Sequence, residues 1–274
     1  MKQGAWLVVC TAFLLVLVST VAIAGDGVMH DPIVISNDYE FTVENGVCSG
    51  SGTLNDPYII ENWIIDAGYA DYGIKIHRTS RAVIIRNVEI SGAAKSAIYL
   101  SYVKNAKIED CIIDANWVGI TFNYSSINRI RGCVLANNTD ALRFYFSSQN
   151  QILANTFEDN EAAIWLDASN ENEISDNYIA DGYTGIYLNL GSEGNVIVGN
   201  AFVNNTRHAY VDDPNIWDED EAGNYWDGFS YIDADENGIW DVPYLISSEA
   251  NQQDNYPLMT HPLVPAPPAP ACEI

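Results

Sequence analysis

Three consecutive stretches of 22 residues decide the fold: GITFNYSSINRIRGCVLANNTD (119–140), ALRFYFSSQNQILANTFEDNEA (141–162) and AIWLDASNENEISDNYIADGYT (163–184). They share few identical residues, yet their apolar positions coincide. Each stretch begins with two apolar residues separated by one other residue, such as Leu142 and Phe144. This alternation predicts a strand with one buried face. A fixed period of this length is typical of solenoids, in which each repeat buries its apolar face against its neighbours.

The repeat continues on both sides of these stretches, with copies that begin at Gly73, Ala97, Gly119, Ala141, Ala163, Gly185 and His208, at intervals of 22 to 24 residues. Two more apolar columns follow in each copy, at Ile85, Ile108, Ile130, Ile152, Ile174 and Ile197, and at Ile90, Ile113, Leu135, Phe157, Ile179 and Phe202. Residues 58–65, YIIENWII, match residues 83–90, VIIRNVEI, and add an earlier turn. Three short strands per copy leave no room for the helices of leucine-rich or helical repeats. The sequence therefore predicts an all-β parallel β-helix of about seven to eight rungs, spaced by roughly 4.8 Å.

Another column lies between the second and third apolar columns and becomes polar along the chain. It consists of Val88, Cys111, Cys133, Asn155, Asn177 and Asn200. Stacked asparagines at a corner exchange side-chain hydrogen bonds along the axis and tolerate left-handed backbone. We therefore interpret these asparagines as structural. The spacing of neighbouring rungs is compatible with a Cys111–Cys133 disulfide. Because in-register neighbours rarely orient well for that bond, buried free thiols are the preferred interpretation.

The chain divides into five segments. Residues 1–24 have the features of a signal peptide: Lys2, an apolar run, and the cleavage pattern Ala22-Ile23-Ala24. An uncleaved anchor is the alternative, because the apolar run approaches spanning length. We expect an N-terminal cap at 25–58, repeats at 59–212, an acidic C-terminal cap at 213–259 and a Pro-rich tail at 260–274. The chain is therefore expected to be secreted or held at the cell surface, with Cys272 in the tail available for self-association or a disulfide.

The charge of the chain limits its partners. The formal net charge is −25, with Lys+Arg 12 against Asp+Glu 37. This charge disfavours nucleic acid and anionic membrane surfaces as partners. Residues 208–274 contain no Lys or Arg but 14 Asp and Glu, whereas ten of the twelve basic residues lie between Lys75 and Arg143. Solubility or adaptation to salt explains the acidic end as well as cation binding does.

The repeats resemble those of the NosD-like family of parallel β-helix proteins, which is grouped with carbohydrate-binding and sugar-hydrolysing β-helices. Residues 46–66, GVCSGSGTLNDPYIIENWIID, and 223–259, GNYWDGFSYIDADENGIWDVPYLISSEANQQDNYPLM, are similar to the opening and closing segments of secreted archaeal members. The resemblance covers roughly residues 33–259 and implies a right-handed, single-stranded β-helix with caps at both ends. The family name implies a role in copper-site maturation. The four histidines and three methionines form no cluster of the ligands that copper prefers.

The segment DADENGIWD, residues 233–241, has the spacing of a calcium loop. Asp233, Asp235, Asn237 and Asp241 occupy positions 1, 3, 5 and 9, and Ile239 would offer its carbonyl oxygen. Tyr244 stands at position 12, where a bidentate Glu is usual. The sequence predicts Ca²⁺ bound in a structural role, and an acidic turn without an ion is the alternative.

The outward residues of the first strand of each copy form the second candidate site. They include Tyr99, Arg143, Tyr145, Trp165, Asp167, Tyr187 and Tyr210. Aromatic rings contact the apolar faces of sugar rings, and the polar members of the set would bond hydroxyls. Aromatic ladders also occur in sheets for structural reasons alone.

Three functional hypotheses follow from these features. The first is a protein that binds a polysaccharide or cell-surface glycan along the aromatic face. The second is a polysaccharide lyase or glycoside hydrolase, for which Asp167 and Arg143 are the nearest catalytic candidates. The third is a structural envelope or adhesion protein. Alanine at Trp165 and Tyr187 tests the first hypothesis, and Asp167→Asn tests the second.

Overall fold

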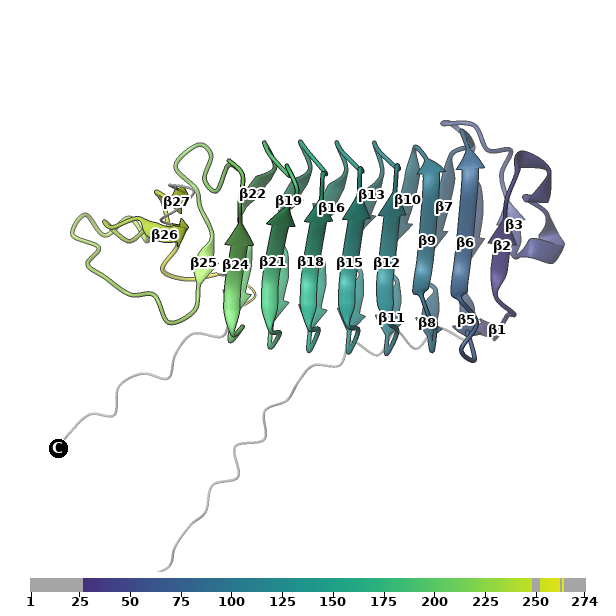
Figure 1. The fold of residues 1–274 in the computed structure, drawn as a ribbon, viewed down its shortest axis with the longest axis horizontal. Coiled ribbons are helices and arrows are strands. Elements are labelled where there is room, and N and C mark those ends of the chain that lie inside the picture. The colour runs from purple at the N-terminus through teal and green to yellow at the C-terminus, as the bar shows by residue number, and fades with distance from the viewer. Residues whose placement is uncertain (1–26, 248–251, 262, 264–274) are drawn as a thin grey trace, which may run out of the picture.

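The computed structural model describes residues 27–247, 252–261 and 263, and it shows a right-handed parallel β-helix of about eight turns (Figure 1). Three sheets run the length of the molecule, and each turn contributes one strand to each sheet. We name them sheets A, B and C. The predicted fold class is confirmed, because successive copies of the repeat stack in register as parallel strands.

Sheet B contains the first strand of each repeat: β2 (Ile33–Ile35), β6 (Tyr72–Thr79), β9 (Ser96–Val103), β12 (Val118–Asn123), β15 (Asp140–Tyr145), β18 (Ala162–Asp167), β21 (Thr184–Asn189) and β24 (Arg207–Val211). Sheet C contains the second: β3 (Val47–Ser49), β4 (Tyr58–Glu61), β7 (Val83–Arg86), β10 (Ala106–Glu109), β13 (Arg129–Arg131), β16 (Gln151–Leu153), β19 (Glu173–Ser175) and β22 (Val196–Val198). Sheet A contains the third: β1 (Val28–Met29), β5 (Trp63–Asp66), β8 (Glu89–Ser91), β11 (Ile112–Asp114), β14 (Val134–Ala136), β17 (Thr156–Glu158), β20 (Tyr178–Ala180), β23 (Ala201–Val203) and β25 (Tyr225–Trp226).

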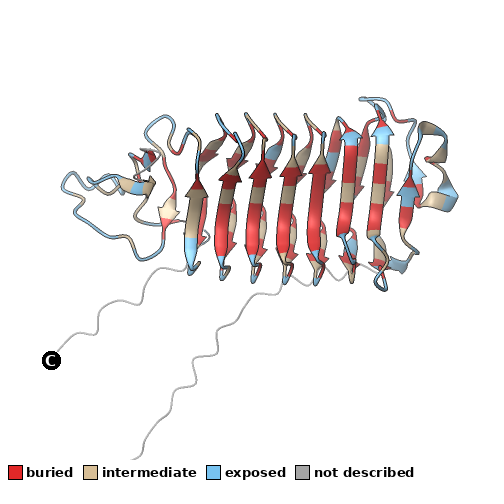
Figure 2. Cartoon of the chain, in the orientation of Figure 1, coloured by how far each residue is buried: buried red, intermediate tan, exposed pale blue. Residues whose placement is uncertain are grey.

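The core is made of the three predicted apolar columns. On sheet B, Ile120 pairs with Leu142 and Leu142 with Ile164, and all three side chains are fully buried. The columns of sheets C and A are buried in the same way, as at Ile152 and Phe157. Figure 2 shows this buried band along the strands. Because each apolar side chain packs on its counterpart one rung away, burial repeats along the axis and holds the rod together.

Buried polar ladders occupy all three corners of the coil. At the C–A corner, the Asn177 Oδ1 accepts from the Asn155 N–H at 2.9 Å, and the Asn155 Nδ2 donates to the Ile130 carbonyl at 3.1 Å. This is the predicted asparagine ladder. Cys111 and Cys133 continue it as free, buried thiols, with the Cys133 Sγ 3.5 Å from the Cys111 N. Each ladder side chain bonds the backbone groups that the corner leaves without a strand partner.

Three further ladders were not predicted. Asn116, Asn138 and Asn160 form one at the A–B corner. At the B–C corner the ladders consist of Ser125, Ser147, Ser169 and Ser192, and of Asn128, Asn150, Asn172, Asn195 and Asn215.

The N-terminal segment covers one end of the coil and also extends it. β1 and β2 continue sheets A and B, while β3 pairs antiparallel with β4. Two short 3-10 helices, η1 (Asp38–Glu40) and η2 (Val43–Asn45), complete the cap. Phe41 lies over the end of the core and stacks on Tyr58 with ring centroids 4.4 Å apart. The strand edge at this end is therefore covered.

The C-terminal cap closes the other end with aromatic side chains and one buried carboxylate. Trp226 of β25 stacks on Phe202 at 4.4 Å and on Tyr244 at 4.2 Å. Tyr244 belongs to β26 (Tyr244–Ser247), which pairs antiparallel with β27 (Gln252–Asp254). Asp254 ends the C–A asparagine ladder by accepting from the Asn224 N–H at 2.7 Å.

No helix among the described residues is long and apolar enough to cross a membrane. The predicted signal peptide at 1–24, Cys272 and nearly all of the Pro-rich tail lie outside the described residues.

Candidate functional site

The outward face of sheet B brings four of the predicted residues into one stack. The Trp165 and Tyr187 ring centroids are 4.4 Å apart, and those of Tyr187 and Tyr210 are 4.6 Å apart. The Arg143 guanidinium lies 4.4 Å from the centroid of Trp165 on the neighbouring rung. Each residue occupies the same strand position one rung further along, so the parallel register itself produces the stack.

The other predicted aromatic residues lie apart from this stack. Tyr99 is separated from Arg143 by Thr121, which is buried and shares a hydrogen bond with Ser96 at 2.7 Å. The Tyr99 ring packs on Tyr72 at 4.9 Å. Tyr145 belongs to the next outward column, and its ring centroid is 5.4 Å from the Arg143 guanidinium. The aromatic face is therefore two groups of rings rather than one continuous ladder.

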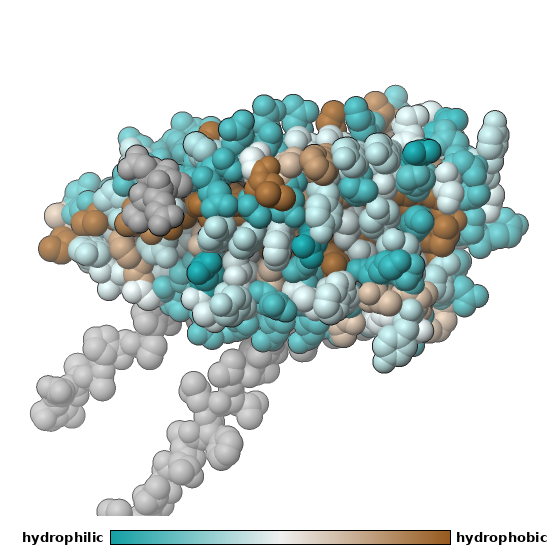
Figure 3. All heavy atoms as spheres, in the orientation of Figure 1, coloured by the Kyte–Doolittle hydropathy of each residue, from teal (hydrophilic) through white to brown (hydrophobic). Residues whose placement is uncertain are grey.

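Stacking determines which part of each ring meets solvent. The Tyr187 and Tyr210 rings are stacked at an interplanar angle of 10°, the Trp165 ring is tilted by 34° against Tyr187, and the Arg143 guanidinium lies over Trp165. These side chains are only partly exposed, so they present ring edges, the indole edge and phenol hydroxyls. Figure 3 shows a largely hydrophilic surface on this side of the molecule, with hydrophobic atoms in small separate groups. Such a surface offers hydrogen-bonding groups rather than open ring faces.

The two catalytic candidates do not form a salt bridge with each other in the described part of the chain. The Arg143 Nη1 pairs with the Asp140 Oδ2 at 2.7 Å. Asp167 is 8% exposed, and its Oδ1 accepts from the Trp165 Nε1 at 2.9 Å. Asp140 was not among the predicted site residues. It occupies the strand position of Ala162 and Thr184 in later repeats, so only its pairing with Arg143 reveals it.

The protonation of this cluster reflects its burial. Burial raises the pKa of Asp140, and the Arg143 guanidinium opposes that shift. Burial also raises the pKa of Tyr145, and the Arg143 guanidinium only partly offsets this rise. The Tyr145 phenol is therefore neutral near pH 7 and is poorly suited to act as a base. The cluster can donate and accept hydrogen bonds, and Asp140 and Arg143 balance each other's charge.

The predicted calcium loop brings three carboxylates together in the C-terminal cap. One oxygen each from Asp233, Asp235 and Asp241 lies within 4.8 Å of the others. The backbone N–H groups of Asn237 and Gly238 donate to Asp233 at 3.1 and 3.0 Å. The Ile239 N–H donates to the Asn237 side chain at 2.8 Å. The loop is therefore turned so that its acidic side chains converge.

Tyr244, at the twelfth position of this loop, is occupied elsewhere. Its ring stacks on Trp226, and burial raises the pKa of its phenol. The loop offers five ligands, so a sixth and any further ligand for a cation would have to come from water or from another part of the cap.

Comparison with known proteins identifies a family and a fold. Residues 21–230 match the profile of a family described as periplasmic copper-binding protein (NosD). No curated protein matches the chain. Among solved structures, the A-module of the mannuronan C-5 epimerase AlgE6 from Azotobacter vinelandii is 16% identical with a TM-score of 0.50, over 58% of this chain and 50% of that chain.

Two further solved structures are more distant. XylC in complex with xylose is 14% identical, with a TM-score of 0.43 over 54% of this chain and 31% of that one. DFA-IIIase from Arthrobacter chlorophenolicus A6 in complex with GF2 is 10% identical, with a TM-score of 0.38 over 65% of this chain and 57% of that chain. This chain thus spans half of the epimerase module, and the likeness concerns the fold alone.

Proposed function

This chain belongs to the NosD family, and from that premise we propose that it is a secreted or cell-surface β-helix that binds a polysaccharide or cell-surface glycan. The family is described as periplasmic, which agrees with a location outside the cytoplasm. The binding surface that we propose is the outward face of sheet B, from Arg143 to Tyr210.

The observation that carries this proposal is the row of polar edges on that face. Arg143, Trp165, Tyr187 and Tyr210 follow one another at one residue per rung. Asp167 and Asn189 lie beside them in the next outward column. A linear glycan also presents hydroxyls at a regular spacing along one direction. A rigid rod that repeats its hydrogen-bonding groups in one direction suits such a ligand, because little ordering is needed on binding.

Copper binding does not fit the donor residues that the structure describes. In the described residues, the one group of three or more His, Cys, Asp or Glu side chains close enough to share an ion is the acidic loop. Copper sites use imidazole and sulfur ligands. Here Cys111 and Cys133 are buried in the ladder, and His208 and His261 bond backbone carbonyls at 3.3 and 2.9 Å.

We also propose Ca²⁺ as a structural ion of the C-terminal cap. Asp233, Asp235, Asn237, Asp241 and the Ile239 carbonyl would supply oxygen ligands, which is the chemistry that Ca²⁺ prefers. The convergence of the three carboxylates supports this assignment. An ion there would relieve their mutual repulsion and would fix the loop against the end of the coil.

Glycan binding is tested with the mature chain on an array of neutral and acidic polysaccharides, followed by calorimetry on the best ligand. The Trp165→Ala/Tyr187→Ala variant is expected to weaken binding by at least tenfold. The matched control is Tyr69→Ala/Tyr183→Ala, which removes two exposed tyrosines from other surfaces and should leave affinity unchanged. Equal affinity of all three proteins would refute the sheet B site, and no binding across the array would favour a purely structural role.

A polysaccharide lyase or glycoside hydrolase remains the second candidate, because Asp140, Arg143 and Asp167 lie on the same face. Mass spectrometry of the polysaccharides after incubation separates the two functions. New oligosaccharides that disappear with Asp167→Asn would establish an enzyme. Unchanged polymers that nevertheless bind would establish a binding protein.

A further inference from the structure

The corner between sheets B and C carries a second row of aromatic residues, which lies outside the sheet B face. Tyr102, Tyr124 and Phe146 occupy the same position in three successive turns and have left-handed backbone, with φ of 55°, 50° and 49°. Bulky side chains are uncommon in this conformation. Ala168 takes the same position in the next turn, with φ of 47°, so the coil does not require an aromatic residue there.

These three rings are exposed and nearly parallel. Tyr102, Tyr124 and Phe146 are 48%, 46% and 54% exposed. Tyr102 and Tyr124 have centroids 5.1 Å apart at an interplanar angle of 3°, and Tyr124 and Phe146 have centroids 4.9 Å apart at 9°. Because the rings cover one another's faces, the solvent meets their edges. The edge of an aromatic ring carries partial positive charge, so this row favours anions over cations.

Cations without a carboxylate partner surround the row. Arg78, Lys104 and Lys107 are exposed, and none of them takes part in a salt bridge within the described residues. The Arg78 guanidinium lies 5.7 Å from the Tyr102 centroid. Lys75, Arg131 and Arg207 are the other described cations without a salt bridge, but Arg78, Lys104 and Lys107 are the ones that line the hollows at this corner.

The same residues line a hollow on the sheet B side of the corner. It has a volume of about 570 Å³ and is lined by Arg78, Thr79, Ser80, Tyr102, Lys104 and Tyr124. Asp38 is the carboxylate that bonds this end of β6, and it is already held by Arg81 at 3.0 Å and by the Thr79 hydroxyl at 2.7 Å. The hollow therefore combines two cations without a salt bridge, Arg78 and Lys104, with the Ser80 hydroxyl and the edges and hydroxyls of two tyrosine rings.

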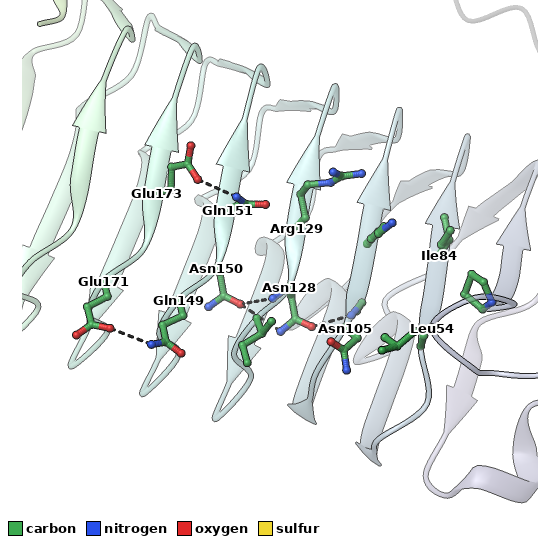
Figure 4. A pocket seen from close by; sticks show the side chains of 15 residues that line it. Leu54, Ile84, Asn105, Asn128, Arg129, Gln149, Asn150, Gln151, Glu171 and Glu173 are labelled. Atoms are coloured by element: carbon green, nitrogen blue, oxygen red, sulfur yellow. Dashed lines mark hydrogen bonds between the residues drawn. The ribbon is translucent and has the colours of Figure 1, made fainter. Parts of the chain in front are cut away.

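A second hollow lies on the sheet C side of the same corner, as Figure 4 shows. Its volume is about 550 Å³, and Leu54, Ile84 and Ile127 form its apolar part. Lys107 of β10 and Arg129 of β13 line its middle rungs, and Arg129 is already paired with Glu109. At one end Glu171 and Glu173 accept hydrogen bonds from Gln149 and Gln151 at 2.9 and 2.8 Å. An anion is thus favoured near Lys107 and repelled near the glutamates.

We propose that Arg78, Tyr102, Lys104, Lys107 and Tyr124 form a binding site, the corner site, for a linear glycan that carries carboxylates. Carboxylates of the polymer pair with the three cations, and its hydroxyls bond the phenol hydroxyls of Tyr102 and Tyr124 and the Ser80 hydroxyl. The polymer runs from one hollow to the other over the segment 102–107, which contributes Tyr102 and Lys104 to the first hollow and Lys107 to the second. This proposal rests on the proposed glycan binding and extends it. It specifies an acidic ligand and a binding surface separate from the sheet B face.

The corner site is tested by calorimetry with the full mature chain and polygalacturonate of defined length, at 50 and 200 mM NaCl. The Arg78→Gln/Lys104→Gln variant is expected to weaken binding by about tenfold or more, since each cation loses a charge-assisted contact. The control Arg131→Gln/Arg207→Gln makes the same change in net charge at two other exposed cations that form no salt bridge in the described chain. It should change affinity by less than twofold. Tyr124→Ser, which removes one ring, should weaken binding by about threefold to tenfold.

The corner site would be overturned by no binding of polygalacturonate to the unaltered chain, by equal losses in the two charge variants, or by equal binding of a neutral glycan. Sulfated glycan and single-stranded DNA serve as competitors, and displacement by either at equal charge concentration would show a general anion surface instead. The Trp165→Ala/Tyr187→Ala variant separates this site from the sheet B face. Retention of polygalacturonate binding in that variant supports the corner site, whereas its loss assigns the ligand to sheet B.

Discussion

Asp254 offers a direct test of how the C-terminal cap is held. It is fully buried at the end of the C–A ladder, where the carboxylate accepts from the Asn224 N–H at 2.7 Å, the Trp226 Nε1 at 2.8 Å and the Tyr256 N–H at 3.0 Å. None of these donors carries a charge. Burial therefore outweighs the hydrogen bonds and raises the pKa of Asp254 to about 6.

The sign and size of the pH effect follow from this pKa. An Asp side chain in an unfolded chain has a pKa of about 3.9. Between about pH 4 and pH 6 the folded chain holds a proton that the unfolded chain has released, so stability falls as pH rises through this window. A shift of about two pKa units corresponds to a loss of about 3 kcal/mol, which is complete above about pH 6.

The Asp254→Asn variant removes this titration. Its amide faces donors at both oxygen positions, so it carries a loss of stability that does not vary with pH. We expect the free energy of unfolding of the unaltered chain to fall by about 3 kcal/mol more than that of the variant between pH 4 and pH 7.

Urea unfolding at constant ionic strength, followed by tryptophan fluorescence, measures this difference, because Trp217 and Trp226 lie in the cap. Asp220→Asn, at an exposed position, is the control and should behave like the unaltered chain. Parallel curves for Asp254→Asn and the unaltered chain across pH 4–7 would refute the argument that burial controls this carboxylate.

Three further predictions follow from the ladder, its thiols and the acidic loop. Asn177→Ala should lower the free energy of unfolding by about 3–6 kcal/mol, because it leaves several buried backbone groups without partners. The control Gln151→Ala, at an exposed position, should change it by less than about 0.5 kcal/mol. Chemical denaturation measures both values. Cys111 and Cys133 should resist a thiol reagent in the folded chain, since burial raises the pKa of Cys133, and peptide mapping should find them modified only after unfolding. Ca²⁺ at millimolar concentration should raise the melting temperature of the unaltered chain by several degrees, and this rise should be absent in Asp233→Asn/Asp235→Asn; an equal rise in both proteins would exclude the loop.

The coil could be predicted from the sequence because the same apolar pattern recurs in every turn. A single alternation such as Leu142 and Phe144 predicts only a strand. The same alternation at every 22 to 24 residues fixes which residues stack, since each rung must bury its apolar side chains on the next. The predicted columns and the asparagine ladder are confirmed for this reason. The serine and asparagine ladders of the B–C corner escaped prediction, because small polar residues at a corner are also typical of exposed turns.

The candidate sites were less predictable, because spacing places a residue on a face and leaves its partners open. Arg143 and Asp167 were expected to act together, but Arg143 pairs with Asp140, three residues earlier on the same strand. Alternation did not predict the corner aromatics, because Tyr102 lies at the end of β9 while Tyr124 and Phe146 directly follow β12 and β15, and all three have left-handed backbone.

The sequence alone determined the repeat, the residues that face inward and the acidic character of the C-terminal end, because periodicity and composition are local properties that need no coordinates. The tertiary structure alone decided which groups remain unpaired. Arg78, Lys104 and Lys107 are three basic residues among twelve in the sequence. Their free charge became apparent only when folding had assigned other cations to Asp38, Glu61, Asp71, Glu109 and Asp140. Pairing depends on distances between rungs and across corners, which a linear pattern does not contain.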